Sequence, residues 1–390
     1  MTNCPSPYIQ KKGTGWPPTL KPQRPFGPST VEIIRSCPLR SCFDASPGYE
    51  RRRDISSRIG SAFHRTLRSF YDEGLPRAKE RAVDEARKRF ELQLKMEELD
   101  AQSHPRERSL PRHSVRIDRA TESIILEAAH FVESRDALRP YHHEKANLGK
   151  TPPPEATMSL GGSFPVEVEV PVSSANGMFT GRIDRARQGR EGVSIYDFKS
   201  ALRDDLPDRY QRQIQLYAMM WRQTRGEWPI AGYVVYPLTG KSYSVSVVPA
   251  VCQAVADESA RAIDGLESEP VASRLAAPGE ICAICEYRPW CKPFWSSQSG
   301  ERSQTRAMEK ASVGFSGPMT RLELRGLRWE ITVAWRNTCV RLSAPEERLP
   351  FLHDARLGET ALVLDTKMRG TPATPLAVFS AYSELFVLLD

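Results

Sequence analysis

Alternation of apolar and polar residues after position 160 is the feature that most restricts the fold of this 390-residue chain. Phe164, Val166, Val168 and Val170 recur at every second position, as in a strand with one buried face. The same reasoning predicts strands at 178–187, 193–199, 231–237 and 242–248, and helices at 207–224 and 250–267. Three strands, a helix and a further strand pair predict an α/β core with a mixed sheet.

Helical periodicity precedes this core. The Ser-x-x-Glu pattern from Ser29 to Glu32 is typical of a capping box and predicts the start of a short helix, which the segment from Pro38 onward interrupts. Longer helices are predicted at 58–71, 77–100 and 115–138. Residues 1–28 are predicted to form a flexible tail, and 29–297 one domain with a helical part (29–160), a core (161–270) and a cysteine segment (278–295).

The C-terminal region has a different pattern. Residues 298–317 are predicted to be a linker, and 318–390 a small β-rich accessory domain. Its predicted strands are 322–333, 338–342, 361–365 and 376–389. Its basic and aromatic residues fit either an oligonucleotide-binding (OB-like) barrel or a docking module for another protein: Arg321, Arg325, Arg328, Trp329, Trp335 and Arg336.

Composition favours an intracellular globular protein. Charged residues make up 26% of the chain and the formal net charge is +7, which only slightly favours a polyanionic partner. We find neither a signal peptide nor an apolar run long enough to cross a membrane, and therefore expect a cytoplasmic location with reduced thiols. Eight cysteines in such a compartment need an explanation other than disulfides.

Two acidic residues and a lysine stand on neighbouring strands. Asp184 and Asp197 flank a short turn at 188–192, so an antiparallel hairpin would bring them together. Lys199 lies two residues beyond Asp197 and therefore points to the same face. Paired carboxylates suit Mg²⁺ or Mn²⁺, and a nearby lysine can orient a water or stabilise charge on phosphorus. The alternative is an ordinary surface ion pair, but the apolar neighbours of these residues place them in the core.

Four motifs occur in a fixed order, and each places polar groups on a strand or helix face. The motifs are Gly60 to His64 (Gly-x-x-x-His), Gly181 to Asp184 (Gly-x-x-Asp), Asp197 to Lys199 (Asp-x-Lys) and Gln213 to Tyr217 (Gln-x-x-x-Tyr). Together they resemble the RecB-like branch of the PD-(D/E)XK nuclease superfamily, which includes CRISPR-associated exonucleases and the nuclease domain of AddB-type helicase–nucleases. The resemblance covers roughly residues 30–295.

The resemblance implies a restriction-endonuclease-like α/β fold and a role for each motif. His64, Asp184 and Asp197 would bind the metal, and Lys199 would be the catalytic lysine. Glu169 fits best as an additional acid, with Glu167 as the alternative. Gln213 and Tyr217 would hold the DNA strand, and we expect nearby groups to guide it: Arg182, Arg185, Arg209 and Tyr210. Taken singly, each of these residues also fits an ordinary structural role.

Three cysteines within ten residues indicate a metal or cluster site. Cys282, Cys285 and Cys291 supply three thiolates, while zinc and a four-iron cluster both need four ligands. Cys37 is the best candidate for the fourth ligand and Cys42 is its rival. Spacing alone allows zinc. The resemblance favours a 4Fe-4S cluster, because iron–sulfur members of the branch place one cysteine before the nuclease core and three after it.

The sequence therefore predicts a Mg²⁺- or Mn²⁺-dependent deoxyribonuclease, an exonuclease acting on single-stranded or frayed DNA ends. DNA repair, CRISPR adaptation and phage defence are the expected processes, with a helicase or integrase-type protein as a partner and no membrane association. Two alternatives stay open: a catalytically silent DNA-binding or assembly protein, and a zinc-stabilised protein–protein adaptor.

Overall fold

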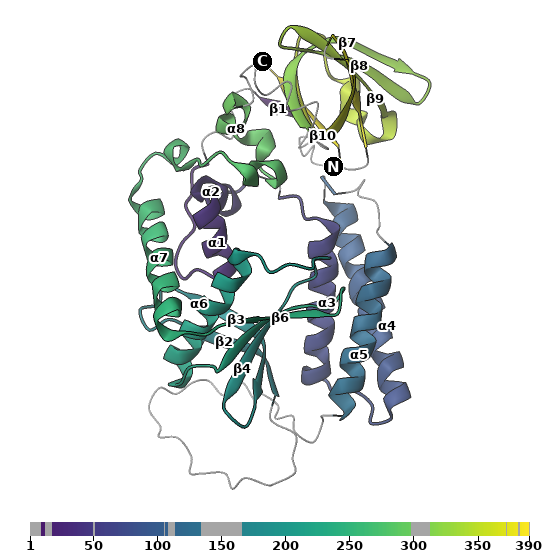
Figure 1. Ribbon diagram of the computed structural model, residues 1–390. Helices are drawn as coiled ribbons and strands as arrows, with labels where there is room; N and C mark the ends of the chain where they lie inside the picture. The colour runs from purple at the N-terminus through teal and green to yellow at the C-terminus, as the bar shows by residue number, and fades with distance from the viewer. Residues whose placement is uncertain are drawn as a thin grey trace.

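The chain combines a mixed sheet, a helical N-terminal part and a C-terminal β-barrel, so the predicted α/β fold class is confirmed (Figure 1). A computed structural model describes residues 9–11, 18–49, 51–104, 106–107, 114–133, 166–297, 313–371, 373–380 and 383–389. Within this part of the chain, no helix has both the length and the hydropathy of a membrane span.

The central sheet has the order β2-β3-β4-β5-β6. Its strands are β2 (Val166–Ser173), β3 (Thr180–Gln188), β4 (Val193–Phe198), β5 (Ala231–Tyr236) and β6 (Lys241–Val245). Only β4 and β5 pair in parallel, because the crossover helix α6 (Asp208–Arg225) joins them. The predicted mixed sheet is therefore present, and each predicted strand falls within a few residues of an observed one.

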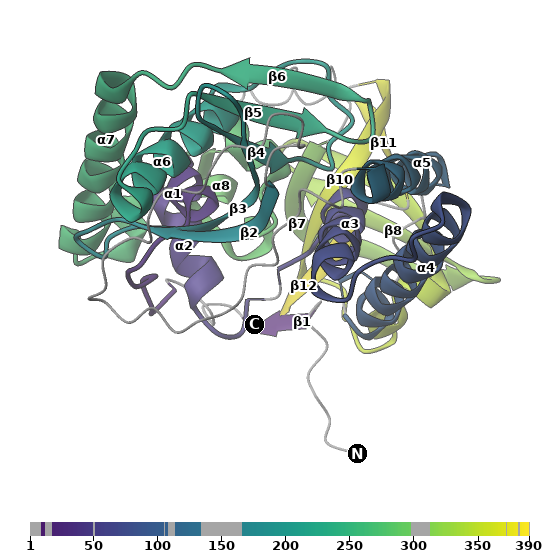
Figure 2. The same ribbon diagram turned by 90° about the horizontal axis from the view of Figure 1, so that it is seen from below.

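Helices cover both faces of this sheet (Figures 1 and 2). On one face α6 and α7 (Pro249–Ser268) bury Ile195 and Val234 in the main core. On the other face lie α3 (Ile55–Asp72), α4 (Lys79–Ser103) and α5 (Ser114–Glu133), whose apolar cluster includes Phe63 and Phe198. The segment 144–162, which we expected to close the helical part, lies outside the described residues, as does the end of the helix predicted at 115–138.

Two short helices stand where one interrupted helix was predicted. They are α1 (Pro28–Ser36) and α2 (Pro38–Ala45). The predicted capping box is wrong: Gly27 is the N-cap, and Glu32 forms an ion pair with Arg212 of α6. Pro38 begins α2 and does not interrupt the helical segment. The N–H groups in the first turn of a helix have no acceptor within the helix, so proline loses no hydrogen bond there.

The predicted flexible tail is also wrong in part. Phe26 is only 2% exposed and lies in the core, and its backbone N–H donates to the carbonyl of Met178. Arg24 pairs with Glu267 at 2.7 Å. Residues 9–11 form β1 (Ile9–Lys11), which pairs in parallel with β12 (Glu384–Leu389). Proline and glycine content concealed these anchors, because single buried residues leave no periodic pattern.

The C-terminal barrel is built from β7 (Val313–Arg325), β8 (Arg328–Trp335), β9 (Thr338–Pro345), β10 (Thr360–Thr371), β11 (Thr374–Val378) and β12 (Glu384–Leu389). The order β7-β8-β9-β11-β10 closes on itself, because β10 also pairs with β7. Short 3₁₀ helices η5 (Glu346–Arg348) and η6 (Pro350–His353) follow β9. The OB-like type of this barrel stays a prediction.

Three boundaries in this region differ from prediction. The strand predicted at 322–333 is two strands, separated by a turn at Gly326, whose φ of +60° favours glycine. The strand predicted at 376–389 is likewise β11 and β12. The predicted linker ends early, because β7 already starts at Val313. Gly317 lets this early part of β7 lie close to β8, because a Cβ at Gly317 would be 1.7 Å from the carbonyl oxygen of Ala334.

The barrel is fixed to the α/β part of the chain by buried ion pairs and an apolar contact. Glu384 of β12 pairs with Arg106 at 3.0 Å and with Arg52 at 3.2 Å. Arg288, from the cysteine segment, pairs with Asp365 of β10 at 2.8 Å. Phe294 of α8 (Lys292–Ser297) joins a cluster with residues of β10 and β12.

We predict that Glu384→Gln lowers the free energy of unfolding by about 3 kcal/mol at pH 7, because two arginines lose their charged partner. Burial alone would raise the pKa of Glu384, but Arg106 and Arg52 outweigh it and lower the pKa. The stabilisation is therefore complete at neutral pH and disappears as the pH falls through that lowered pKa. Denaturation of both proteins at pH 7 and in acid measures the difference. The exposed Glu347→Gln is the control, and an equal loss there would contradict the prediction.

Candidate active site

Three carboxylates occupy one row across β2, β3 and β4. The β2–β3 register is the same on both sides of Glu169 and Asp184, which places them opposite each other. Pairing of Arg185 with Tyr196 places the next residues of β3 and β4, Asp184 and Asp197, opposite each other as well. Residues in one row lie about 5 Å apart on adjacent strands, so the acids can act on one substrate group.

The strands are irregular at this row. Glu169 has a φ of +50°, in the left-handed region that non-glycine residues rarely adopt. Ile183 and Ala186 are three residues apart, yet both lie in the core beneath α6, so strict alternation is interrupted between them. This break leaves Glu169 and Asp184 facing α3 rather than α6. Such strain costs on the order of 1–3 kcal/mol and is typical of functional sites.

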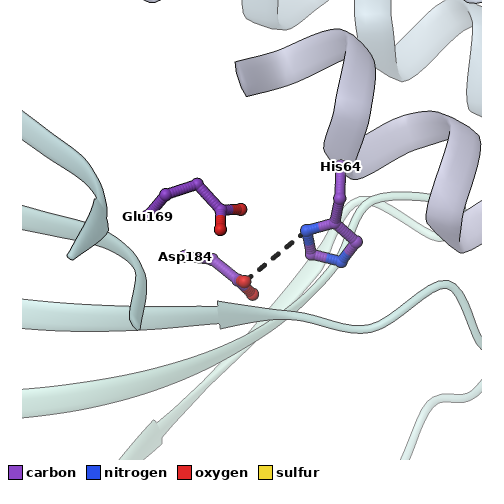
Figure 3. A group of neighbouring side chains, drawn as sticks. All are labelled: His64, Glu169 and Asp184. Carbon is purple, nitrogen blue, oxygen red and sulfur yellow. Dashed lines mark ion pairs between the residues drawn. The ribbon is translucent and has the colours of Figure 1, made fainter. Parts of the chain in front are cut away.

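His64 of α3 completes a set of ligands that can share one ion. One ligand atom from each of His64, Glu169 and Asp184 lies within 4.8 Å of the others, and Nδ1 of His64 is 3.5 Å from Oδ1 of Asp184 (Figure 3). Glu167, the alternative acid, instead pairs with Arg225 at 2.7 Å. The structure thus brings Glu169, and not Glu167, to this group.

Asp197 faces Lys199 instead of the ligand group. Their Oδ2 and Nζ atoms lie 2.7 Å apart and form an ion pair. Asp184 also fixes the strand end, since its Oδ2 accepts a 2.6 Å hydrogen bond from the backbone N–H of Phe198. The predicted acid pair is therefore adjacent, and Asp197 as a direct metal ligand stays a prediction.

The electrostatics of this row suit a cation. Burial, reinforced by the charge of Asp197, raises the pKa of Asp184 to about 6, although His64 opposes the shift. Burial would lower the pKa of Lys199, but its ion pair with Asp197 outweighs this and raises it, so the lysine keeps its proton. A divalent ion would relieve the repulsion between the carboxylates.

Helix α6 packs on the opposite side of the acidic row from α3. Gln213 and Tyr217 are buried, as their i and i+4 spacing on one helix face requires. Burial, together with the charges of Asp197, Asp184 and Glu169, raises the pKa of Tyr217 well above its ordinary value, and its ring packs closely against Gly181 of β3. The side-chain oxygen of Gln213 is buried and has no hydrogen-bond partner within the described residues.

A cleft of about 730 Å³ opens over the site. His64, Glu169 and Lys199 line it, together with five arginines: Arg65, Arg68, Arg116, Arg203 and Arg209. Tyr210 also lines the cleft, and its ring lies 5.0 Å from Nζ of Lys199 and 4.8 Å from the guanidinium of Arg209. We did not anticipate Arg116, because it lies in a different predicted element, far from the motifs in sequence.

Two predicted guiding residues lie elsewhere. The guanidinium of Arg185 forms an ion pair with Glu127 and lies 4.9 Å from the ring centre of Phe198. These internal contacts engage the side chain, so it is not available to bind DNA. Arg182 is exposed on β3, opposite Pro171, and does not line the cleft. Of the four residues proposed to guide the DNA strand, the structure brings Arg209 and Tyr210 to the cleft.

A comparison with known protein families assigns the chain that carries this site to a superfamily. The family model of the PD-(D/E)XK nuclease superfamily matches residues 25–292. The chain belongs to this superfamily. It is therefore a nuclease, and superfamily members typically use a divalent metal. No curated protein matches the chain.

The superfamily match extends over all four predicted cluster cysteines. Cys37 stands between α1 and α2 as the C-cap of one and the N-cap of the other. Cys282, Cys285 and Cys291 lie around η3 (Glu280–Ile284) and η4 (Arg288–Trp290), which follow η2 (Ala272–Leu275). Burial, then the charges of the other three thiols, raises the pKa of Cys291 to about 12. Arg40 of α2 pairs with Glu286 at 2.9 Å, so the segment that follows Cys37 lies beside the segment that carries the other three cysteines.

We predict that Gly181→Ala destabilises this superfamily member by about 1–3 kcal/mol. A Cβ at Gly181 would lie 2.8 Å from the ring of Tyr217 and 3.2 Å from Pro28, so the ring facing the acids would have to move. Urea denaturation measures the loss. Gly265→Ala in α7 is the matched control, because its Cβ would meet open space and should stabilise the helix by up to about 1 kcal/mol. Unchanged stability of the Gly181 variant would contradict the close approach.

Proposed function

We propose that the protein hydrolyses DNA phosphodiesters with a Mg²⁺ or Mn²⁺ ion held by His64, Glu169 and Asp184. The observation that carries this proposal is the convergence of these three ligand atoms within 4.8 Å, beside the Asp197–Lys199 ion pair. Carboxylate oxygens suit both ions, and one imidazole among them favours Mn²⁺. When bound, the ion would supply Lewis-acid activation of the phosphoryl group.

The surrounding residues would position and stabilise the reacting group. Lys199 is protonated and buried beside the acids, so it would stabilise negative charge that develops on the phosphate. Asp197 holds the Lys199 ammonium by the 2.7 Å contact, which fixes its direction. Gln213 and Tyr217 would hold the substrate strand next to the acids, for which the unpartnered oxygen of Gln213 is available.

The cleft favours single-stranded or frayed DNA as the substrate, and the likeness to the RecB-like branch favours an exonuclease as the enzyme type. Arg116 and Arg209 line it, and neither has a carboxylate partner within the described residues. Arginines without acid partners suit phosphate binding. The ring of Tyr210 lines the cleft near Lys199 and Arg209 and would stack on an unpaired base, which a duplex keeps inside its own stack.

Asp184→Asn should lower the cleavage rate on single-stranded DNA with Mn²⁺ by about 10³-fold or more, roughly 4 kcal/mol, because a carboxylate that holds the ion and the end of β4 is lost. Binding to the same DNA in a chelator should persist. Asp257→Asn, an exposed acid of α7, is the control and should cleave like the wild type. A wild-type protein that binds Mn²⁺ and DNA but cleaves neither single strands nor frayed ends would support the catalytically silent alternative.

We also propose that Cys37, Cys282, Cys285 and Cys291 hold a 4Fe-4S cluster. The donor set of four thiols fits such a cluster, and Cys37 contributes to the raised pKa values of both Cys285 and Cys291. The rival Cys42 is fully buried, and burial raises its pKa to about 11. One cysteine before the core and three after it, together with the order of the four motifs, support assignment to the RecB-like branch.

Cys37→Ser should reduce bound iron and sulfide and the visible absorption of anaerobically purified protein to a small fraction of the wild-type values. It should also destabilise the junction of α2 with the cysteine segment. Cys252→Ser is the control, because this buried thiol of α7 belongs to the main core. Zinc in place of iron and sulfide in the wild type would overturn the cluster and favour a zinc site.

A role in DNA repair, CRISPR adaptation or phage defence, with a helicase or integrase-type partner, remains part of the proposal. It rests on the likeness to the RecB-like branch.

A further inference from the structure

A row of basic residues crosses the strands of the C-terminal barrel. Arg369 of β10 pairs with Leu376 of β11, which pairs with Arg341 of β9. The row continues from Arg341 to Thr332 of β8, and from there to Arg321 of β7. Every second position is therefore an arginine, and adjacent arginines lie two strands, or roughly 10 Å, apart.

These side chains lie on the outside of the barrel. The neighbours of Arg341 in β9, Val340 and Leu342, are at most 1% exposed, whereas Arg341 itself is exposed. The same alternation makes Arg369 exposed next to buried Met368. The three arginines and the two residues between them thus form one outward-facing set, which we call the barrel row: Arg321, Thr332, Arg341, Leu376 and Arg369.

The charges of the barrel row are not neutralised within the barrel. Arg341 and Arg369 have no ion pair among the described residues, and neither does Lys367, two residues before Arg369. Only Arg321 is paired, at 2.8 Å to Glu323. Glu323 and Glu330 lie two residues from Arg321 and Thr332 along their strands, so the charge without a carboxylate partner belongs to the other end of the row, at Arg341 and Arg369. Positive charge of this kind fits a polyanionic ligand.

One apolar side chain stands among these charges. Leu376 is 41% exposed and lies between Arg341 and Arg369 in the row. A duplex offers only phosphate and sugar to such a surface, whereas the bases of a single strand can cover it. We propose that the barrel row is a second binding site for single-stranded nucleic acid, an inference that rests on the nuclease function proposed above.

The position of the row leaves this site accessible. The contacts that fix the barrel come from Asp365, Glu384 and the apolar cluster with Phe294. Arg369 lies beyond Asp365 in β10, and Arg341 stands on β9, which takes no part in these contacts. The barrel lies at one end of the molecule, beyond the N-terminal end of α3, which lines the cleft (Figure 1). A long strand could therefore occupy both sites, and a short one only the cleft.

The test compares Arg341→Gln/Arg369→Gln with wild type in full-length protein. Fluorescence anisotropy with oligo(dT) of about 30 nucleotides, in chelator, should show about tenfold weaker binding of the variant at 0.15 M salt. The slope of log K against log[salt] should be less steep by about 1.4, since each lost phosphate contact on a single strand removes about 0.7. Arg356→Gln, an exposed barrel arginine outside the row, is the matched control and should leave both values unchanged.

Length and ligand type decide the outcome. The double variant should bind and cleave an oligonucleotide of about 8 nucleotides as the wild type does, because the cleft alone holds it. Equal losses on 8 and 30 nucleotides, an equal loss in the control, or an unchanged salt slope would overturn the proposal. A larger effect on duplex DNA or on an acidic peptide would overturn the choice of ligand. Because binding is measured in chelator, failure of the catalytic proposal leaves this result interpretable.

Discussion

Repulsion between neighbouring carboxylates is the constraint on which the rest of the active region depends. Glu169, Asp184 and Asp197 stand in one row across three strands, and burial strengthens their mutual repulsion. The surrounding structure compensates for it with His64 from one helix layer, Lys199 from the end of β4 and a backbone hydrogen bond to Asp184. The α3 layer and the end of β4 therefore both contribute stabilising groups to the same row.

Close approach of the helices to this row requires small residues. Gly181 leaves room for the ring of Tyr217, and Gly60 lets α3 approach Ser200, whose Oγ would lie 2.5 Å from an added Cβ. The hydroxyl of Ser200 donates to the carbonyl of Ser56, so the start of α3 is tied to the end of β4. The glycines of the first two motifs thus have a packing reason that is independent of catalysis.

Prediction from sequence succeeded where a pattern repeats. The strands of the core followed from alternation, and the nearness of Asp184 to Asp197 followed from the hairpin. It failed where one contact decides the structure, as for Phe26 in a proline-rich segment. The direction of Glu169 depends on a left-handed backbone that no propensity indicates. Arg185 looked available for DNA because its partner Glu127 stands 58 residues earlier in the chain.

The ion pairs beneath the barrel have a consequence for how the chain can be divided. Three arginines from remote segments meet the same two carboxylates, Asp365 and Glu384: Arg52 before α3, Arg106 after α4 and Arg288 between Cys285 and Cys291. The guanidinium of Arg106 also lies 5.1 Å from the ring centre of Trp290 and 5.6 Å from that of Phe386. The barrel therefore holds three remote segments of the chain together, and removing it would destabilise the nuclease domain.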